Sequence, residues 1–144
     1  MKKILLTIMI ALTALPLFGQ LKTKSSNKID NLGSVRMGVI TVLQSNIGIS
    51  MGMTTDNRFD NPGIFVLGED KDSAIQTLND LIGILEGEET VTVECAPSHE
   101  CDLMPKKQLG VKTLYFYFDS CAGKQNVTRQ ELEKVIDIIE KKAK

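Results

Sequence analysis

The sequence predicts an α+β domain in which two amphipathic helices lie on one face of an antiparallel sheet of about five strands. Two observations lead to this fold class. Stretches of alternating or β-branched apolar residues, typical of strands, are separated by short polar turns. Two other stretches space their apolar residues by three and four positions, as the buried stripe of a helix does. The predicted order is strand–strand–strand–helix–strand–strand–helix, and short turns between neighbouring strands favour antiparallel pairing.

Three strands are predicted before residue 70. Residues 34–43 are rich in β-branched side chains, and residues 47–54 alternate apolar with small or polar side chains. The short "QSN" between them is expected to form the turn of a hairpin. Residues 55–63 are dense in Asp, Asn, Pro and Gly and predict a loop, and residues 64–68 a short strand.

Both helices carry recognisable ends. In the first, Asp70 or Asp72 is expected to cap the N-terminus, and Gly87 is expected to end the helix. The second begins at Thr128, which forms a capping box with Glu131. Between the helices, the sequence predicts strands at 90–94 and 111–119, joined by an unusually long loop.

The N-terminus has the pattern of a secretory signal peptide. Two lysines precede an uncharged apolar run of about 14 residues, which is short for a membrane span. We expect residues 1–19 to be the signal peptide, with cleavage after Gly19 or Gln20; the alternative is an uncleaved anchor. Residues 20–33 are expected to be a flexible leader and residues 34–144 a single α+β domain. The protein is therefore predicted to be exported, to the periplasm or the extracellular space.

Charge and motifs exclude several classes of function. The formal net charge is −1, and basic residues cluster only in the terminal "KKAK". Nucleic acids and anionic membranes need a positive patch, so neither is an expected partner once the signal is removed. The chain lacks a P-loop, a GxSxG elbow, an HExxH motif and a dinucleotide fingerprint, and we expect no cofactor.

The cysteines offer the clearest candidate site. Cys95, His99 and Cys101 fall in the long predicted loop, and Cys121 follows the next strand. Export favours disulfides. If the two strands flanking the loop pair directly, Cys121 lies about 30 Å from Cys95, beyond the reach of a disulfide. We therefore predict a Cys95–Cys101 disulfide and a free thiol at Cys121. A bridge from Cys121 remains open if those strands lie apart in the sheet.

Two other uses of these residues remain as alternatives. Cys95, His99, Cys101 and Cys121 have the ligand chemistry of a zinc site, and exported proteins also handle copper. The cysteine spacing does not match the usual paired ligands, so a metal site is not the preferred interpretation. A thiol enzyme centred on Cys101 or Cys121 would need a histidine within hydrogen-bond reach of the thiol.

One strand also presents a candidate binding face. On the strand at 47–54, the small residues Gly48, Ser50 and Gly52 alternate with apolar ones and share the opposite face. Small side chains leave room for a ligand or another backbone to approach closely. With no catalytic motif in view, the preferred function is a soluble, non-enzymatic module that binds a protein or small ligand. Whether the chain is an enzyme stays open at this point.

Overall fold

The computed structural model describes residues 28–144, so the predicted signal peptide and most of the predicted leader lie outside it. The described chain is an α+β fold, as predicted. Its elements are the strands β1 (Asp30–Val35), β2 (Ile40–Ser45), β3 (Gly48–Met53), β4 (Gly63–Gly68), β5 (Val91–Ala96), β6 (His99–Gln108), β7 (Val111–Phe118) and β8 (Lys124–Thr128), and the helices α2 (Lys71–Glu86) and α3 (Arg129–Lys142).

The strands form two sheets of four rather than one sheet of about five. Each sheet is an antiparallel meander, with the orders β1-β2-β3-β4 and β5-β6-β7-β8. Each meander is followed by one helix, so the two halves of the domain share the same order of elements. The predicted antiparallel pairing is confirmed, but the predicted single sheet of about five strands is wrong, because the described residues form eight strands in two sheets.

The first sheet has one strand more than predicted, because the single strand predicted over residues 34–43 is divided into β1 and β2. A turn at Arg36 and Met37 divides residues 34–43, and both turn residues have positive φ angles, 51° and 52°. β1 starts at Asp30 and takes in residues that the sequence assigned to the leader. The β2–β3 hairpin is the one predicted from the alternation in residues 47–54.

The second sheet contains two strands, β6 and β8, that were not predicted from the sequence. β6 replaces the predicted long loop, and β8 follows β7. Pro105 lies inside β6, although proline cannot donate to a sheet ladder. Val91, the first residue of β5, pairs with Leu103, so Pro105 lies past the end of β5 and pairs only with Leu114 of β7. Pro105 therefore has a strand partner on one side only.

The helix ends match the sequence expectations. Asp70 is the N-cap of α2, and its carboxylate accepts a hydrogen bond of 2.8 Å from the Ser73 backbone N–H. Gly87 closes the same helix. Thr128 caps α3, and Glu131 bonds back to the Thr128 N–H at 2.8 Å, completing the predicted capping box.

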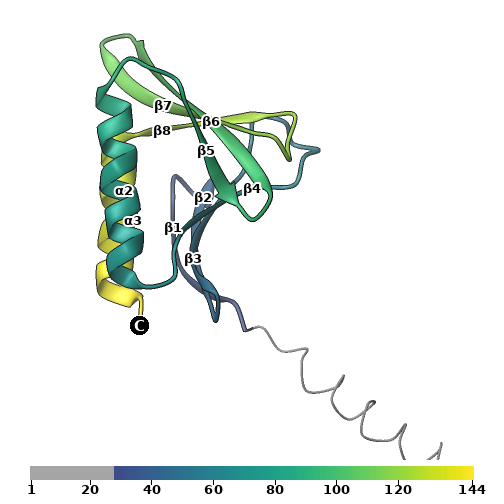
Figure 1. Ribbon diagram of the computed structural model, residues 1–144, viewed down its shortest axis with the longest axis vertical. Helices are drawn as coiled ribbons and strands as arrows, with labels where there is room; N and C mark the ends of the chain where they lie inside the picture. Colours follow the sequence, from purple (N-terminus) through teal and green to yellow (C-terminus); the bar gives the residue numbers. More distant parts are fainter. Residues whose placement is uncertain (1–27) are drawn as a thin grey trace, which may run out of the picture.

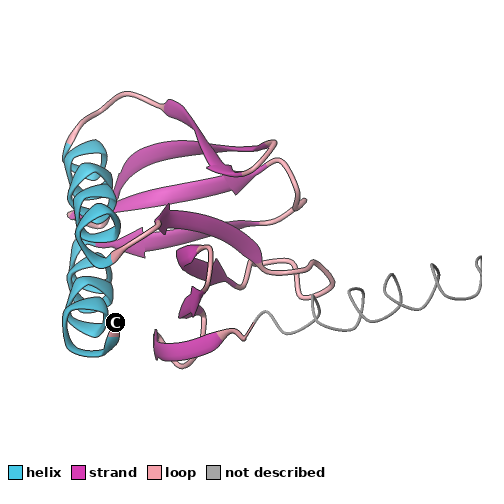
Figure 2. Cartoon of the chain, turned by 60° about the horizontal axis from the view of Figure 1, so that its bottom comes forward, coloured by secondary structure: helices cyan, strands magenta, loops and turns pink. Residues whose placement is uncertain are grey.

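Both helices lie side by side on one side of the two sheets (Figure 1), and Figure 2 shows the same layer from another direction. They run antiparallel, because Lys71 at the start of α2 bonds the Glu140 carbonyl near the end of α3 at 3.0 Å. One core joins all the elements, and Phe65 of β4 meets Phe116 of β7 edge-to-face, with ring centroids 5.6 Å apart. Within residues 28–144, neither helix combines the length and the apolar character that crossing a membrane requires.

Candidate functional site

The chain's only histidine lies at the same end of the second sheet as Cys95 and Cys121. β6 runs antiparallel to both β5 and β7, so β5 and β7 run in the same direction. Cys95, near the end of β5, and Cys121, just past the end of β7, therefore lie at one end of the sheet, where β6 begins at His99. The 30 Å separation expected from direct pairing of the flanking strands is wrong, because β6 lies between them.

All three cysteines are free thiols, so the predicted Cys95–Cys101 disulfide is not formed in this structure. The residues expected to form a closed loop form the β5–β6 hairpin instead. Within it, Cys101 faces the core opposite Val93 and Phe118. Cys95 lies where the register shifts between Glu94 and Ala96, and its thiol donates to the His99 carbonyl at 3.5 Å.

The thiols of Cys95 and Cys101 in the β5–β6 hairpin are buried and weakly acidic. Cys95 is 1% exposed and Cys101 is 0% exposed. Burial, with a smaller contribution from the Asp119 carboxylate, raises the pKa of Cys95. Burial, followed by the neighbouring Cys95, raises the pKa of Cys101 to about 12. Because the thiolate is the nucleophile and the metal ligand, neither group is poised to react at neutral pH.

His99 is held by the carboxylate of Asp119, which no sequence motif indicates. Its Nδ1 lies 3.1 Å from Oδ1 of Asp119, and the other oxygen of that carboxylate accepts the Glu100 backbone N–H at 2.9 Å. The Glu100 N–H and then His99 lower the pKa of Asp119. Both side chains of the pair are exposed. Asp119 fixes one ring nitrogen and leaves Nε2 available to a ligand.

Cys121 is the accessible thiol of the three. Its side chain is half-buried, and its Sγ donates to the Asn61 carbonyl at 3.2 Å. It lines a cavity of about 330 Å³ together with His99 and Ile64. The thiol thus shares a hollow with the imidazole, but it is bonded to a backbone oxygen instead of the ring.

The four residues weighed as metal ligands do not converge on a common point. Among residues 28–144, no group of three or more His, Cys, Asp or Glu side chains is placed to hold a metal ion. Cys101 turns into the core, and the Cys121 thiol is bonded to Asn61.

Of the three residues predicted to form a binding face on β3, only Ser50 is partly open to solvent, and Gly52 is buried. Ser50 lies between Leu43 of β2 and Val66 of β4, and Gly52 lies between Thr41 and Ile64, all on the face away from the core. The terminal carbon of Ile64 lies over Gly52, 3.7 Å from where a Cβ would stand.

Gly48, the third predicted residue of that face, has a structural role. Its φ is +139°, and a Cβ there would clash with the backbone carbonyl of Gly68. It is buried where β3 and β4 approach closely. The period-two pattern placed it correctly in the strand, but the register shift after Ile49 removes it from the open face.

The open face continues into a cleft between the two sheets, which we call the β4 cleft. Its lining residues are Asn61, Pro62, Ile64 and Val66 from the first sheet and the loop before β4, and Glu94, Cys95, Ala96, Pro97, His99, Ser120 and Cys121 from the second sheet and its loops. Two adjoining cavities, of about 340 and 330 Å³, make up this cleft. Ile64 is 40% exposed and Val66 is 39% exposed, so apolar surface is open to solvent at its wall.

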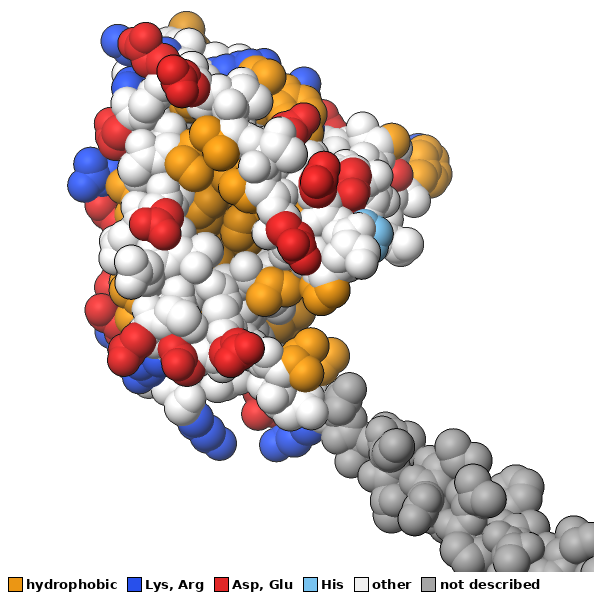
Figure 3. Space-filling model, viewed as in Figure 1, with side chains coloured by type: hydrophobic (Ala, Val, Ile, Leu, Met, Phe, Trp, Pro, Cys, Tyr) orange, Lys and Arg blue, Asp and Glu red, His pale blue; other side chains and the backbone are white. Residues whose placement is uncertain are grey.

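Both strands beside the β4 cleft are edge strands. β4 ends the first sheet and β5 begins the second, and they are neighbours without being paired. Figure 3 shows apolar side chains gathered in a hollow between α2 and β5, bordered by acidic side chains. Ile75 and Ile82 of α2 and Val93 of β5 are partly buried and pack against the core. Apolar surface therefore lies on both sides of the unpaired β5 edge.

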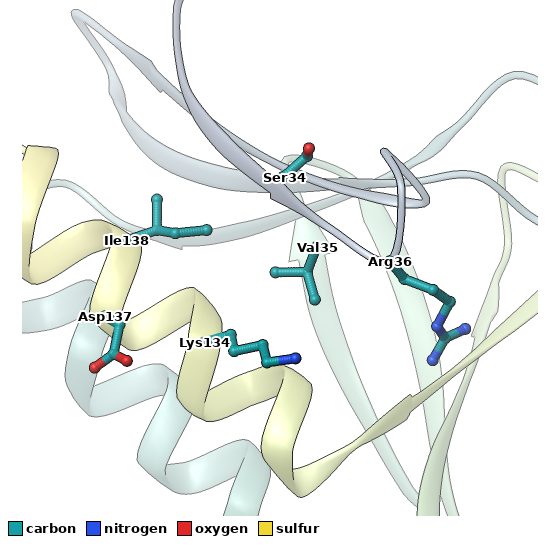
Figure 4. Close-up of a pocket in the computed structure, with 6 residues that line it drawn as sticks. All are labelled: Ser34, Val35, Arg36, Lys134, Asp137 and Ile138. Carbon is teal, nitrogen blue, oxygen red and sulfur yellow. The ribbon is translucent and has the colours of Figure 1, made fainter.

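A separate hollow of about 360 Å³ lies between β1 and α3, and Figure 4 shows the residues around it. Lys134 reaches toward it from α3, whereas the Arg36 guanidinium turns away toward β8. Arg36 is bonded bidentately to Glu131 and also to the Asn126 carbonyl at 2.9 Å. The Arg36 network therefore joins the β1–β2 turn to β8 and α3 and is structural.

Comparison with known proteins identifies no relative of this chain. No protein-family model matches the sequence, and no match is found among curated proteins or among solved structures.

Proposed function

We propose that the chain is an exported, non-enzymatic binding module that takes up an extended, apolar segment of a partner protein along the β4 cleft. The observation that carries the proposal is the exposure of Ile64 and Val66 beside two cavities, between two unpaired edge strands. Exposed apolar side chains grouped in this way mark interaction surfaces.

The backbone of the edge strands supports an extended ligand. An edge strand presents a row of free N–H and C=O groups, and a partner segment can satisfy them by adding as a further strand. β4 and β5 each offer such an edge. Alternate side chains of an added strand point to opposite faces, so one set would contact the apolar wall of the cleft.

The small residues of β3 extend the same surface. Ser50 adds little bulk between Leu43 and Val66 and leaves their side chains uncovered. Export is part of the proposal and rests on the pattern of residues 1–19. Intact mass of the secreted protein tests it, with a mature chain that starts at Gln20 or Leu21 as the expected result.

Selection of peptides from a random display library on the purified mature protein tests the binding site. Selected peptides should alternate apolar and polar residues and should bind saturably. Val66→Lys and Ser50→Arg should each weaken binding about tenfold or more, because they place a charge or a bulky side chain on the apolar wall. Asp80→Lys, on the exposed side of α2, is the matched control and should leave affinity unchanged.

Two results would contradict the proposal. One is the absence of any saturable peptide. The other is a peptide whose affinity falls equally in all three variants, which would place its site elsewhere or reflect charge alone.

A thiol-dependent activity at Cys121 is the second candidate function. Cys121 is half-exposed and shares its cavity with His99, which Asp119 orients. A general base activates a cysteine only within hydrogen-bond reach, and here the thiol is bonded to Asn61, so this candidate ranks second. An alkylation rate for Cys121 that falls about tenfold in His99→Gln would favour it, and an unchanged rate would exclude His99 as the activating base.

A further inference from the structure

The outer face of the second sheet carries the only two tyrosines of the chain. Tyr115 and Tyr117 alternate along β7 with the buried residues Leu114, Phe116 and Phe118, so the tyrosines face away from the core. Their rings are stacked, with centroids 6.3 Å apart and planes at 26°. Both are half-buried, which leaves part of each ring open to solvent.

Two lysines from the flanking strands converge on these rings. Lys106 of β6 places its Nζ 4.9 Å from the centre of the Tyr115 ring and 5.9 Å from that of Tyr117. Lys124 of β8 places its Nζ 5.8 Å from both ring centres. One ammonium group from each flanking strand therefore lies near the same aromatic pair, at distances where cation–π attraction is favourable.

Neither ammonium group forms an ion pair with a carboxylate in residues 28–144. The carboxylate opposite Tyr117 is that of Asp102, and it accepts the Thr92 hydroxyl at 2.6 Å on the β5 side of the sheet. The ammonium groups of Lys106 and Lys124 thus lie near the same two rings, and no carboxylate in the described part of the chain contacts either of them. Like charges held together repel, and a bound anion would relieve that repulsion.

The Tyr117 hydroxyl is a third hydrogen-bond donor beside the two ammonium groups of Lys106 and Lys124. Lys106 Nζ donates to this hydroxyl oxygen at 3.3 Å, so the hydroxyl proton remains free to donate in turn. The Tyr115 hydroxyl is instead engaged by Gln108, at 3.0 Å. Two ammonium groups and one hydroxyl thus lie around one pair of rings as donors for an anionic ligand.

From this arrangement we infer that Lys106, Lys124 and Tyr117 form a binding site for a small ligand that carries an oxyanion, such as a carboxylate, phosphate or sulfate group. The site lies on the open face of β6, β7 and β8 and is separate from the β4 cleft, so it does not rest on the proposed function. Charged donors give the strongest hydrogen bonds to such oxygens. The stacked rings beside the donors offer an apolar surface for the rest of the ligand.

The charge of the site favours a small ligand over a nucleic acid strand. A strand needs a row of cations along its backbone, whereas this face supplies two, in a protein whose net charge is −1. Asp102, at the border of the face, would repel a second phosphate.

Tyrosine fluorescence reports on this site directly, because the chain has no tryptophan and both tyrosines lie here. The full mature protein is titrated separately with inorganic phosphate, sulfate and acetate, at ionic strength held constant with sodium chloride. We expect a saturable change in fluorescence with at least one of the three ions, and the order of their affinities identifies the headgroup. Asp102→Asn should raise the affinity a few-fold, since it removes the nearby negative charge.

Substitution of single lysines separates the site from general charge effects. Lys106→Gln and Lys124→Gln should each lower the affinity about tenfold or more, while Lys107→Gln, an exposed neighbour on β6, should change it less than twofold. Chemical shifts of the tyrosine rings in each variant check that the stacked pair Tyr115–Tyr117, the tyrosine platform, is intact. A response no larger than that to sodium chloride, or an equal loss in all three variants, would overturn the inference. An oligouridylate that binds more tightly than all three ions, with an affinity that collapses as salt rises, would replace the small ligand with a nucleic acid.

Discussion

Alkylation of the native protein should discriminate sharply between its three thiols. A buried thiol reacts slowly both because reagent cannot reach it and because little of it is ionised. The pKa of about 12 for Cys101, against an ordinary 9.0, reduces its thiolate fraction about a thousandfold at pH 8. Cys101 is also fully buried, so its native reaction requires local opening of the hairpin. We therefore expect Cys121 to react more than a thousandfold faster than Cys101.

Digestion with trypsin after labelling separates the cysteines into two peptides. Residues 72–106 contain Cys95 and Cys101, and residues 113–124 contain Cys121 alone. The protein is treated with iodoacetamide at pH 8, samples are quenched over time, and both peptides are quantified by mass spectrometry. The same reaction in concentrated urea, where all three thiols are accessible, supplies the reference rates.

Two outcomes would refute this reasoning. Labelling of residues 72–106 within tenfold of the rate of residues 113–124 would show that the hairpin thiols are not protected. Failure of residues 72–106 to react even in urea, together with a mass two hydrogens lower, would show a Cys95–Cys101 disulfide, as the sequence predicts.

Three further changes test the packing. Phe116→Ala should lower the free energy of unfolding in urea by about 3–5 kcal/mol, because the ring is fully buried between both sheets; a loss under about 1 kcal/mol would contradict its central place. Gly63→Ala should cost about 1–3 kcal/mol, since the added methyl would clash with the Phe118 ring; equal melting temperatures would argue against that contact. Glu131→Gln should cost about 1–2 kcal/mol at pH 7 by removing the partly buried ion pair with Arg36. Burial raises the pKa of Glu131, but the bonds from Arg36 and Thr128 outweigh it and hold that pKa below 4.5. The stabilisation is thus complete above about pH 5 and lost as pH falls through the lowered pKa, so the wild type and the variant should converge in acid; a constant difference down to pH 2 would disprove this.

The parts of the fold that the sequence predicted well are those specified by local interactions. Asp70, Gly87 and the Thr128–Glu131 capping box act within one helical turn, so the residue pattern determines them directly. The same holds for the β2–β3 hairpin, in which alternation continues on both sides of a short turn.

The parts that the sequence predicted poorly depend on tertiary context. β6 alternates Cys101 and Leu103 inward with Asp102 outward, but charged residues and Pro105 obscure this pattern. Its identity as a strand depends on β7, which pairs with β6 from Cys101 to Gln108. The prediction without β6 also reversed the relative direction of the flanking strands, and that error placed Cys121 far from Cys95.

Asp119 and the Tyr115–Tyr117 platform were missed for a related reason. Tyrosines two residues apart in a strand share a face, but Lys106 and Lys124 come from strands that were not predicted. The partners of a surface site are cross-strand neighbours, so they become recognisable only once the order of the strands is known.

The order of the strands also has a consequence for how the chain folds. Every hydrogen-bonded pair of strands joins elements adjacent in sequence, so both ladders can form from short-range contacts, which favours rapid folding. The step that remains is the docking of the two meanders, in which β1 packs against α3. β1 can therefore reach its final packing only after α3 has been synthesised, and a chain that emerges slowly from a ribosome or an export channel cannot complete this part of its core before the residues of α3 appear.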